Sequence, residues 1–176
     1  MNRFSREIII ILLLIVVNGI FALAEVAVVA SRKTRLRQLA KEGDAKAQAA
    51  LELAESPNRF LSTVQVGITL IGVLAGAFGG ATVSEEIAAY LRGVPAFSAH
   101  ADSIGLGLVV FAITYLSLVV GELVPKRIAL HNPERIASFI AAPMEWLSRL
   151  AAPIVALLSG STDAVLRLIG LQSSPE

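Results

Sequence analysis

The sequence contains no cysteine and only two histidines. Without thiols there is no disulfide framework, no thiolate metal site and no cysteine nucleophile. His100 and His131 have no partner at the spacing of zinc ligands, so a zinc site is not expected and any metal ion would bind mainly oxygen atoms. The chain also lacks a phosphate-binding loop, a nucleophile elbow and a zinc-protease motif, which argues against an enzyme.

Charged residues are scarce and unevenly distributed. Hydrophobic residues make up 55% of the 176 residues, and the mean hydropathy is +0.72, whereas an ordinary soluble domain is roughly 45–50% apolar. The formal net charge is +1, but residues 8–24 carry no charge and the basic residues gather in the segment that follows. This pattern predicts an integral membrane protein and not a soluble domain.

Three apolar stretches are long enough to cross the hydrocarbon core as helices, which takes about 20 residues each. The first of them is too long for a signal peptide and is followed by a strongly basic segment. We therefore expect an all-α membrane protein with three transmembrane helices, at about residues 8–30, 60–83 and 104–124.

The segments between the spans also have distinct compositions. Residues 32–55 are rich in Ala, Leu, Lys and Glu and predict an amphipathic helical hairpin, with its break at Gly43-Asp44. Residues 84–103 are more polar and predict a loop, and Pro125 is expected to end the third span.

Residues 132–170 are apolar, but charges and two prolines, Pro143 and Pro153, interrupt them. This pattern favours a juxtamembrane helical belt over a fourth crossing. Residues 171–176 resemble a linker, so we expect a cytosolic domain that would follow this chain to be missing from it.

The distribution of Lys and Arg predicts the orientation, because the cytosolic side retains the excess of positive charge. That excess lies in the hairpin and after the third span, which places the N-terminus outside a bacterial-type inner (cell) membrane. The basic hairpin is better explained by contact with anionic lipids than by nucleic acid. The basic residues counted are Arg32, Lys33, Arg35, Arg37, Lys41, Lys46, Arg59, Lys126, Arg127 and Arg135, against Arg92 in the second connection.

Glu25 is a carboxylate inside the first span. Asn18, Ala22 and Glu25 follow at i, i+4 and i+7, which places them on one helical face. A carboxylate at this depth is costly unless it faces a cavity or a partner, so it is a candidate functional group. The alternative is that Glu25 reaches water or pairs with Arg32 or Lys33 at the cytosolic end of the span.

The third span contains a second candidate, the sequence Gly-Glu-Leu-Val-Pro at residues 121–125. Pro125 has no N–H, so the carbonyl of Gly121 loses its helical hydrogen bond and is expected to be free beside the Glu122 carboxylate. Broken helices in transporters bind ions in this way, and Mg²⁺, Ca²⁺ and Na⁺ prefer oxygen ligands. The alternative is a helix end at the interface, with a solvated acid before Lys126.

The second span is rich in small residues. Gly72, Gly76 and Gly80 repeat every four residues, a pattern typical of close helix packing, and we expect a homodimer packed through small residues. Gln65 and Thr69 share one face and could line an ion path, although such residues often only bond the backbone or a neighbouring helix.

Three motifs together resemble the transmembrane domain of the CorC/cyclin M family, and the resemblance covers essentially the whole chain. They are NGIFALAE at 18–25 followed by ASRK at 30–33, TVQVGITL at 63–70, and GELVPK at 121–126. The resemblance implies a dimer that exports Mg²⁺ coupled to Na⁺ entry, with Gly121 and Glu122 matching the ion-site motif. Asn18, Glu25 and Thr69 complete the metal-binding residues that we expect. Family members usually continue into a cytosolic CBS-domain pair that binds adenine nucleotides, so ATP would act only through domains absent here.

This chain departs from the family pattern at two positions. Family members commonly have serine at the position of Ala22, and animal members have asparagine near the position of Ile68. Both departures remove oxygen ligands and weaken the assignment of Mg²⁺, which demands near-octahedral coordination. Two alternatives follow from the resemblance: an exporter of organic diamines, as some bacterial relatives are, or a membrane anchor that transports nothing.

Overall fold

The computed structural model describes residues 3–170, and every regular element in this range is helical. The prediction of an all-α protein is thus confirmed for these residues, while the predicted linker at 171–176 lies outside them. The elements are α1 (Arg3–Ala30), α2 (Lys33–Lys41), α3 (Ala45–Glu55), α4 (Pro57–Phe78), the π-helix η1 (Gly79–Val83), α5 (Ser84–Arg92), the 3₁₀ turn η2 (Ser98–His100), α6 (Ala101–Leu118), the π-helix η3 (Val119–Leu123), α7 (Val124–His131) and α8 (Pro133–Leu168).

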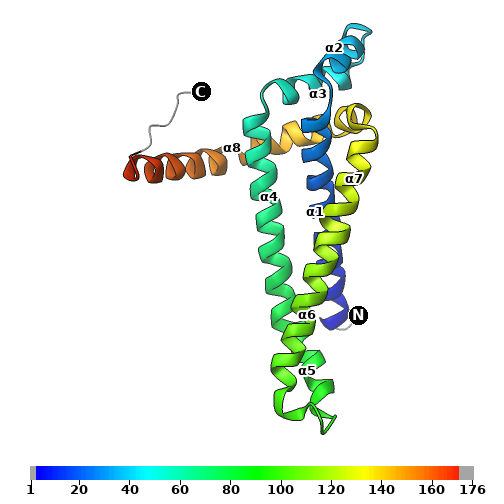
Figure 1. The fold of residues 1–176 in the computed structure, drawn as a ribbon, viewed down its shortest axis with the longest axis vertical. Helices are drawn as coiled ribbons and strands as arrows, with labels where there is room; N and C mark the ends of the chain where they lie inside the picture. Colours follow the sequence, from blue (N-terminus) through cyan, green and yellow to red (C-terminus); the bar gives the residue numbers. More distant parts are fainter. Residues whose placement is uncertain (1–2, 171–176) are drawn as a thin grey trace.

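Three long helical rods run side by side along the long axis of the molecule (Figure 1). One is α1, the second is α4 with η1 and α5, and the third is α6 with η3 and α7. The short helices α2 and α3 cap one end of the rods, and α8 lies across the bundle near that same end. Each predicted span lies within one of the three rods.

Two boundaries predicted from the sequence are wrong. The third rod does not end at Pro125 but continues to His131, because this proline lies in the first turn of α7, where a missing N–H costs little. Residues Ser84–Arg92 are not a loop but the helix α5, which packs against α6. Gly105 makes that packing possible, since a Cβ there would lie 2.9 Å from the Ser84 carbonyl oxygen.

Helix α8 is continuous through Pro143 and Pro153, so the expectation that these prolines break the helix is wrong. Both prolines are on the exposed side of α8, where losing a backbone hydrogen bond is tolerated. Within the described residues, four helices are long and apolar enough to cross a membrane, and α8 is one of them. Because α8 lies across the other three in Figure 1, three crossings with a cytosolic hairpin stay our prediction.

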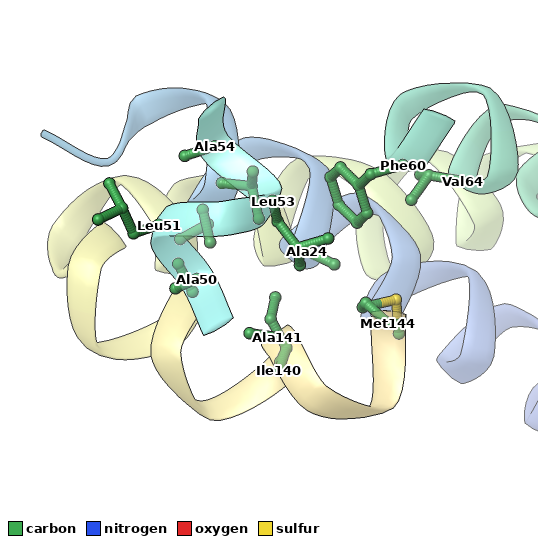
Figure 2. Packing of buried hydrophobic residues seen from close by; sticks show 14 of the residues in the cluster. Ala24, Ala50, Leu51, Leu53, Ala54, Phe60, Val64, Ile140, Ala141 and Met144 are labelled. Carbon is green, nitrogen blue, oxygen red and sulfur yellow. The ribbon is translucent and has the colours of Figure 1, made fainter. Parts of the chain in front are cut away.

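The main apolar core lies where α1, α3, α4 and α8 meet (Figure 2). Alanines dominate it: Ala24, Ala50 and Ala141 are 0% exposed and allow the helix backbones to approach closely. Phe60, at the start of α4, is 1% exposed and fills the space between them. Glu134 attaches α8 to this core, because its buried carboxylate accepts a hydrogen bond of 2.9 Å from Arg32 Nε just beyond α1.

The glycines of α4 and η1 differ in their surroundings. A Cβ on Gly72, Gly76 or Gly80 would have no heavy atom of this chain within 4 Å, so this face is not used for packing inside the chain. Whether it packs against a second copy stays a prediction. A Cβ on Gly67, in contrast, would lie 2.8 Å from the ring of Phe21 on α1.

We expect Gly67→Ala to destabilise the domain by about 1–3 kcal/mol, because the added methyl group would push the buried Phe21 ring out of its position. Thermal unfolding of the purified protein in detergent measures the effect. Gly72→Ala is the matched control on the same helix and should leave the midpoint unchanged or slightly higher, because its methyl group has room and alanine favours a helix. Equal midpoints for the two variants would show that α1 and α4 do not pack as described.

Candidate functional site

The candidate site is built around the π-helix η3. In this segment the backbone N–H of Val124 donates to the carbonyl of Val119, five residues earlier, so the regular α-helical pattern is interrupted. The carbonyl of Gly121 would next receive the N–H of residue 125, but that residue is proline. The proline therefore removes the ordinary α-helical donor to the Gly121 carbonyl, as the sequence predicts.

Helix α1 lies close enough to η3 for one of its side chains to donate a hydrogen bond to the Gly121 carbonyl. Asn18 Nδ2 donates a hydrogen bond of 3.0 Å to the Gly121 oxygen. The sequence predicted that this oxygen would be free, but it is bonded to a side chain. Gly19 permits the approach, since a Cβ there would lie 3.2 Å from the Val120 oxygen and 3.1 Å from Pro125 Cγ. The oxygen of the same side-chain amide, Asn18 Oδ1, is buried and accepts no hydrogen bond from the described residues.

Lys126 joins the two predicted carboxylates. Its Nζ lies 2.7 Å from Glu122 Oε1 and 3.7 Å from Glu25 Oε2, so an acid from α1 and an acid from η3 share one ammonium group. The three side chains are between 30% and 40% exposed in this chain, and they therefore lie neither in bulk water nor in a dry core. With both acids ionised, the cluster carries a formal charge of −1.

Sequence reasoning missed the role of Lys126, which it treated only as part of the basic segment after the third span. The signal was present, because Glu122 and Lys126 are four residues apart and so face each other on a helix. The sequence suggested Arg32 or Lys33 as alternative ion-pair partners of Glu25, and this prediction is wrong. Arg32 pairs with Glu134, and it is Lys126 that lies next to Glu25.

The structure brings four of the five residues predicted to bind metal to the contact of α1 with η3 and α7: Asn18 is bonded to Gly121, and Lys126 joins Glu25 to Glu122. Thr69 is exposed on α4, and within the described residues its side chain makes no hydrogen bond or ion pair to any of them. The described residues also contain no group of three or more His, Cys, Asp or Glu side chains that could hold a metal. A cation here would therefore depend on the carbonyl and amide oxygens as well as on carboxylates.

Comparison with known proteins agrees with this architecture. The model of the cyclin M transmembrane N-terminal domain matches residues 8–176. A UPF0053 protein of Synechocystis is 56% identical over 167 residues, which are 95% of this chain and 37% of that protein. An uncharacterized protein of Mycobacterium tuberculosis is 35% identical over 94% of this chain and 47% of its own length.

A relative with a named activity is the polyamine export protein of Escherichia coli, which is 30% identical over 94% of this chain and 37% of its own length. The chain thus spans less than half the length of each of these relatives. From the match of the family model over nearly all of its residues, we conclude that the chain belongs to the cyclin M transmembrane N-terminal domain family.

Proposed function

We propose that this domain is a secondary cation transporter, and that its main substrate is Mg²⁺, exported in exchange for Na⁺. The observation that supports the proposal is the buried, unpaired Asn18 Oδ1 next to the Gly121 carbonyl, on a π-helix that also carries Glu122. These three oxygen types are the ligands that hard cations prefer. Intramembrane polar groups of this kind typically mark an ion path.

The residues supply fewer oxygens than the six that Mg²⁺ requires. Asn18 Oδ1, the Gly121 carbonyl and Glu122 could provide about half of an octahedral set, and Mg²⁺ usually retains several waters when it binds to proteins. The Ala22 side chain is fully buried and offers no oxygen. We therefore expect a partly hydrated ion, for which Glu122 would have to release the Lys126 ammonium group.

The second candidate substrate is an organic diamine. Two observations favour it: the E. coli relative is named a polyamine export protein, and Glu25 and Glu122 already hold a primary alkylammonium group, that of Lys126. A diamine needs carboxylates but no coordination shell, so the missing oxygens at Ala22 and Ile68 would not matter.

Reconstitution of the full chain into liposomes tests whether Mg²⁺ or a diamine is the substrate. With a Mg²⁺-sensitive dye and an imposed Na⁺ gradient, we expect Mg²⁺ flux that Glu122→Gln abolishes, because the amide removes the ligand charge while keeping the shape. Glu86→Gln, which changes an exposed acid on α5, should retain the flux. Flux of radiolabelled 1,4-diaminobutane without Mg²⁺ flux would establish the diamine reading. If no cation moves, the domain is only an anchor.

We further propose that the N-terminus faces the outside and the α2–α3 hairpin the cytosol. The chain has no cysteine, so a single introduced cysteine reports its side of the membrane to an impermeant maleimide added to intact cells. We expect labelling of Tyr90→Cys, at the α5 end of the bundle, and protection of Lys41→Cys and Ser159→Cys. Labelling of Ser159→Cys would instead show that α8 crosses the membrane.

A further inference from the structure

A cavity of about 170 Å³ lies between α3, the start of α4 and α8, apart from the Lys126 cluster. Its apolar wall includes Leu53 and Phe60, which are 9% and 1% exposed. Its polar wall includes Arg59, Ser148 and Arg149. The proposed transport site uses none of these residues, so the cavity needs its own explanation.

Arg59 brings a guanidinium group to this cavity. Its Nη2 donates a hydrogen bond of 3.2 Å to the carbonyl of Ser148 on α8, and within the described residues it forms no ion pair. Two acids and Arg149 also line the cavity, so its four charged side chains sum to a formal charge of zero. Glu145 pairs with Arg149 at 2.5 Å, and Glu52 accepts a hydrogen bond of 2.9 Å from Gln48.

Two further groups in the cavity wall can donate to an anion. The Ser148 side chain belongs to a residue that is 5% exposed, yet its Oγ has no hydrogen-bond partner among the described residues. The 22-residue helix α4 begins at this cavity, and the Ser56 side chain before it makes no capping hydrogen bond. A helix N-terminus carries a partial positive charge and commonly binds phosphate groups.

The neighbouring surface indicates which phosphate compound could reach this cavity. Trp146 and Leu150, next to the cavity residues of α8, are 65% and 62% exposed. Exposed tryptophan is typical of the headgroup level of a bilayer, and basic segments beside spans attract anionic lipids. An acyl chain could lie along the apolar surface while the headgroup enters the cavity.

We propose that this cavity binds the phosphate of an anionic phospholipid headgroup, with Arg59, the Ser148 hydroxyl and the N-terminus of α4 as its hydrogen-bond donors. A lipid bound there would join α4 to α8, two helices that also meet through the core and through the hydrogen bond from Arg59. The proposal concerns binding only, so it can be tested whether or not the domain transports a cation.

The test is lipid binding by the full chain, measured by native mass spectrometry and by thermal unfolding in detergent with added lipid. We expect phosphatidylglycerol to bind and raise the unfolding midpoint more than phosphatidylcholine does. Ser148→Ala should weaken phosphatidylglycerol binding by about tenfold, because a hydrogen bond to a charged group is lost. Arg59→Lys keeps the charge but loses the planar fork, and it should weaken binding as well.

Arg35→Gln is the control for general surface charge, since Arg35 is exposed on α2 and does not line the cavity. It should bind phosphatidylglycerol as the unchanged protein does. The proposal is wrong if Arg35→Gln loses as much binding as Ser148→Ala, or if both Ser148→Ala and Arg59→Lys bind normally. Stabilisation by inorganic phosphate to the same extent would overturn the lipid assignment and leave a site for soluble phosphate.

Discussion

Replacing Lys126 with methionine is expected to make the stability of the domain depend on added cations. The substitution keeps an unbranched side chain but removes the ammonium group that lies between Glu25 and Glu122. The two carboxylates then repel each other without compensation. Because all three groups are partly exposed, we expect a loss on the order of 1–2 kcal/mol.

Added Mg²⁺ or a diamine should restore the lost stability of the Lys126→Met variant by taking the place of the ammonium group. The measurement is the thermal unfolding midpoint across a titration of each cation, at constant ionic strength. Lys33→Met, at the exposed start of α2, is the control and should show no such dependence. If the Lys126→Met midpoint ignores every cation tested, the carboxylates do not form a cation site.

The second large effect is expected from Pro125→Ala. Alanine restores the backbone N–H at position 125, which can then donate to the Gly121 carbonyl in the ordinary helical pattern. That carbonyl would then share its oxygen with a backbone donor and would bind Asn18 or a cation less strongly. We expect cation flux in liposomes to fall about tenfold or more, while thermal stability changes little, since the better helix propensity of alanine offsets the lost packing of the buried Pro125 ring.

Pro153→Ala is the matched control for Pro125→Ala. It makes the same chemical change at an exposed position inside α8, far along the chain from η3. We expect it to keep full flux. Unimpaired flux in Pro125→Ala would mean that the Gly121 carbonyl takes no part in transport.

Much of the fold could be predicted because hydrocarbon restricts the choices available to a chain. Runs of about 20 apolar residues located all three rods, although the third rod continues through the basic residues that were expected to end it. The prolines could not be interpreted from their identity alone. Pro125 lies in the first turn of a helix, and Pro143 and Pro153 lie on an exposed face, so none of them ends a helix as expected.

The candidate site could be predicted residue by residue but not as an arrangement. Asn18 and Gly121 were each recognised from local chemistry, but their hydrogen bond depends on how α1 and η3 are aligned. That alignment depends on Gly19 packing against Val120 and Pro125, a contact between distant parts of the sequence. The π-helix differs from an α-helix by one residue of register, which the apolar pattern does not record, and the charge of Lys126 was assigned to the basic segment after the third span.

The two π-helices have a geometric consequence for motion in this domain. A π-helix differs from an α-helix by one inserted residue, and removing that insertion turns the helix beyond it by about 100° and shifts it by about 1.5 Å. Returning η3 to the α pattern would therefore rotate Lys126 and the rest of α7 relative to α6. A change of one residue in register would be enough to part Lys126 from Glu25, without any large movement of the rods.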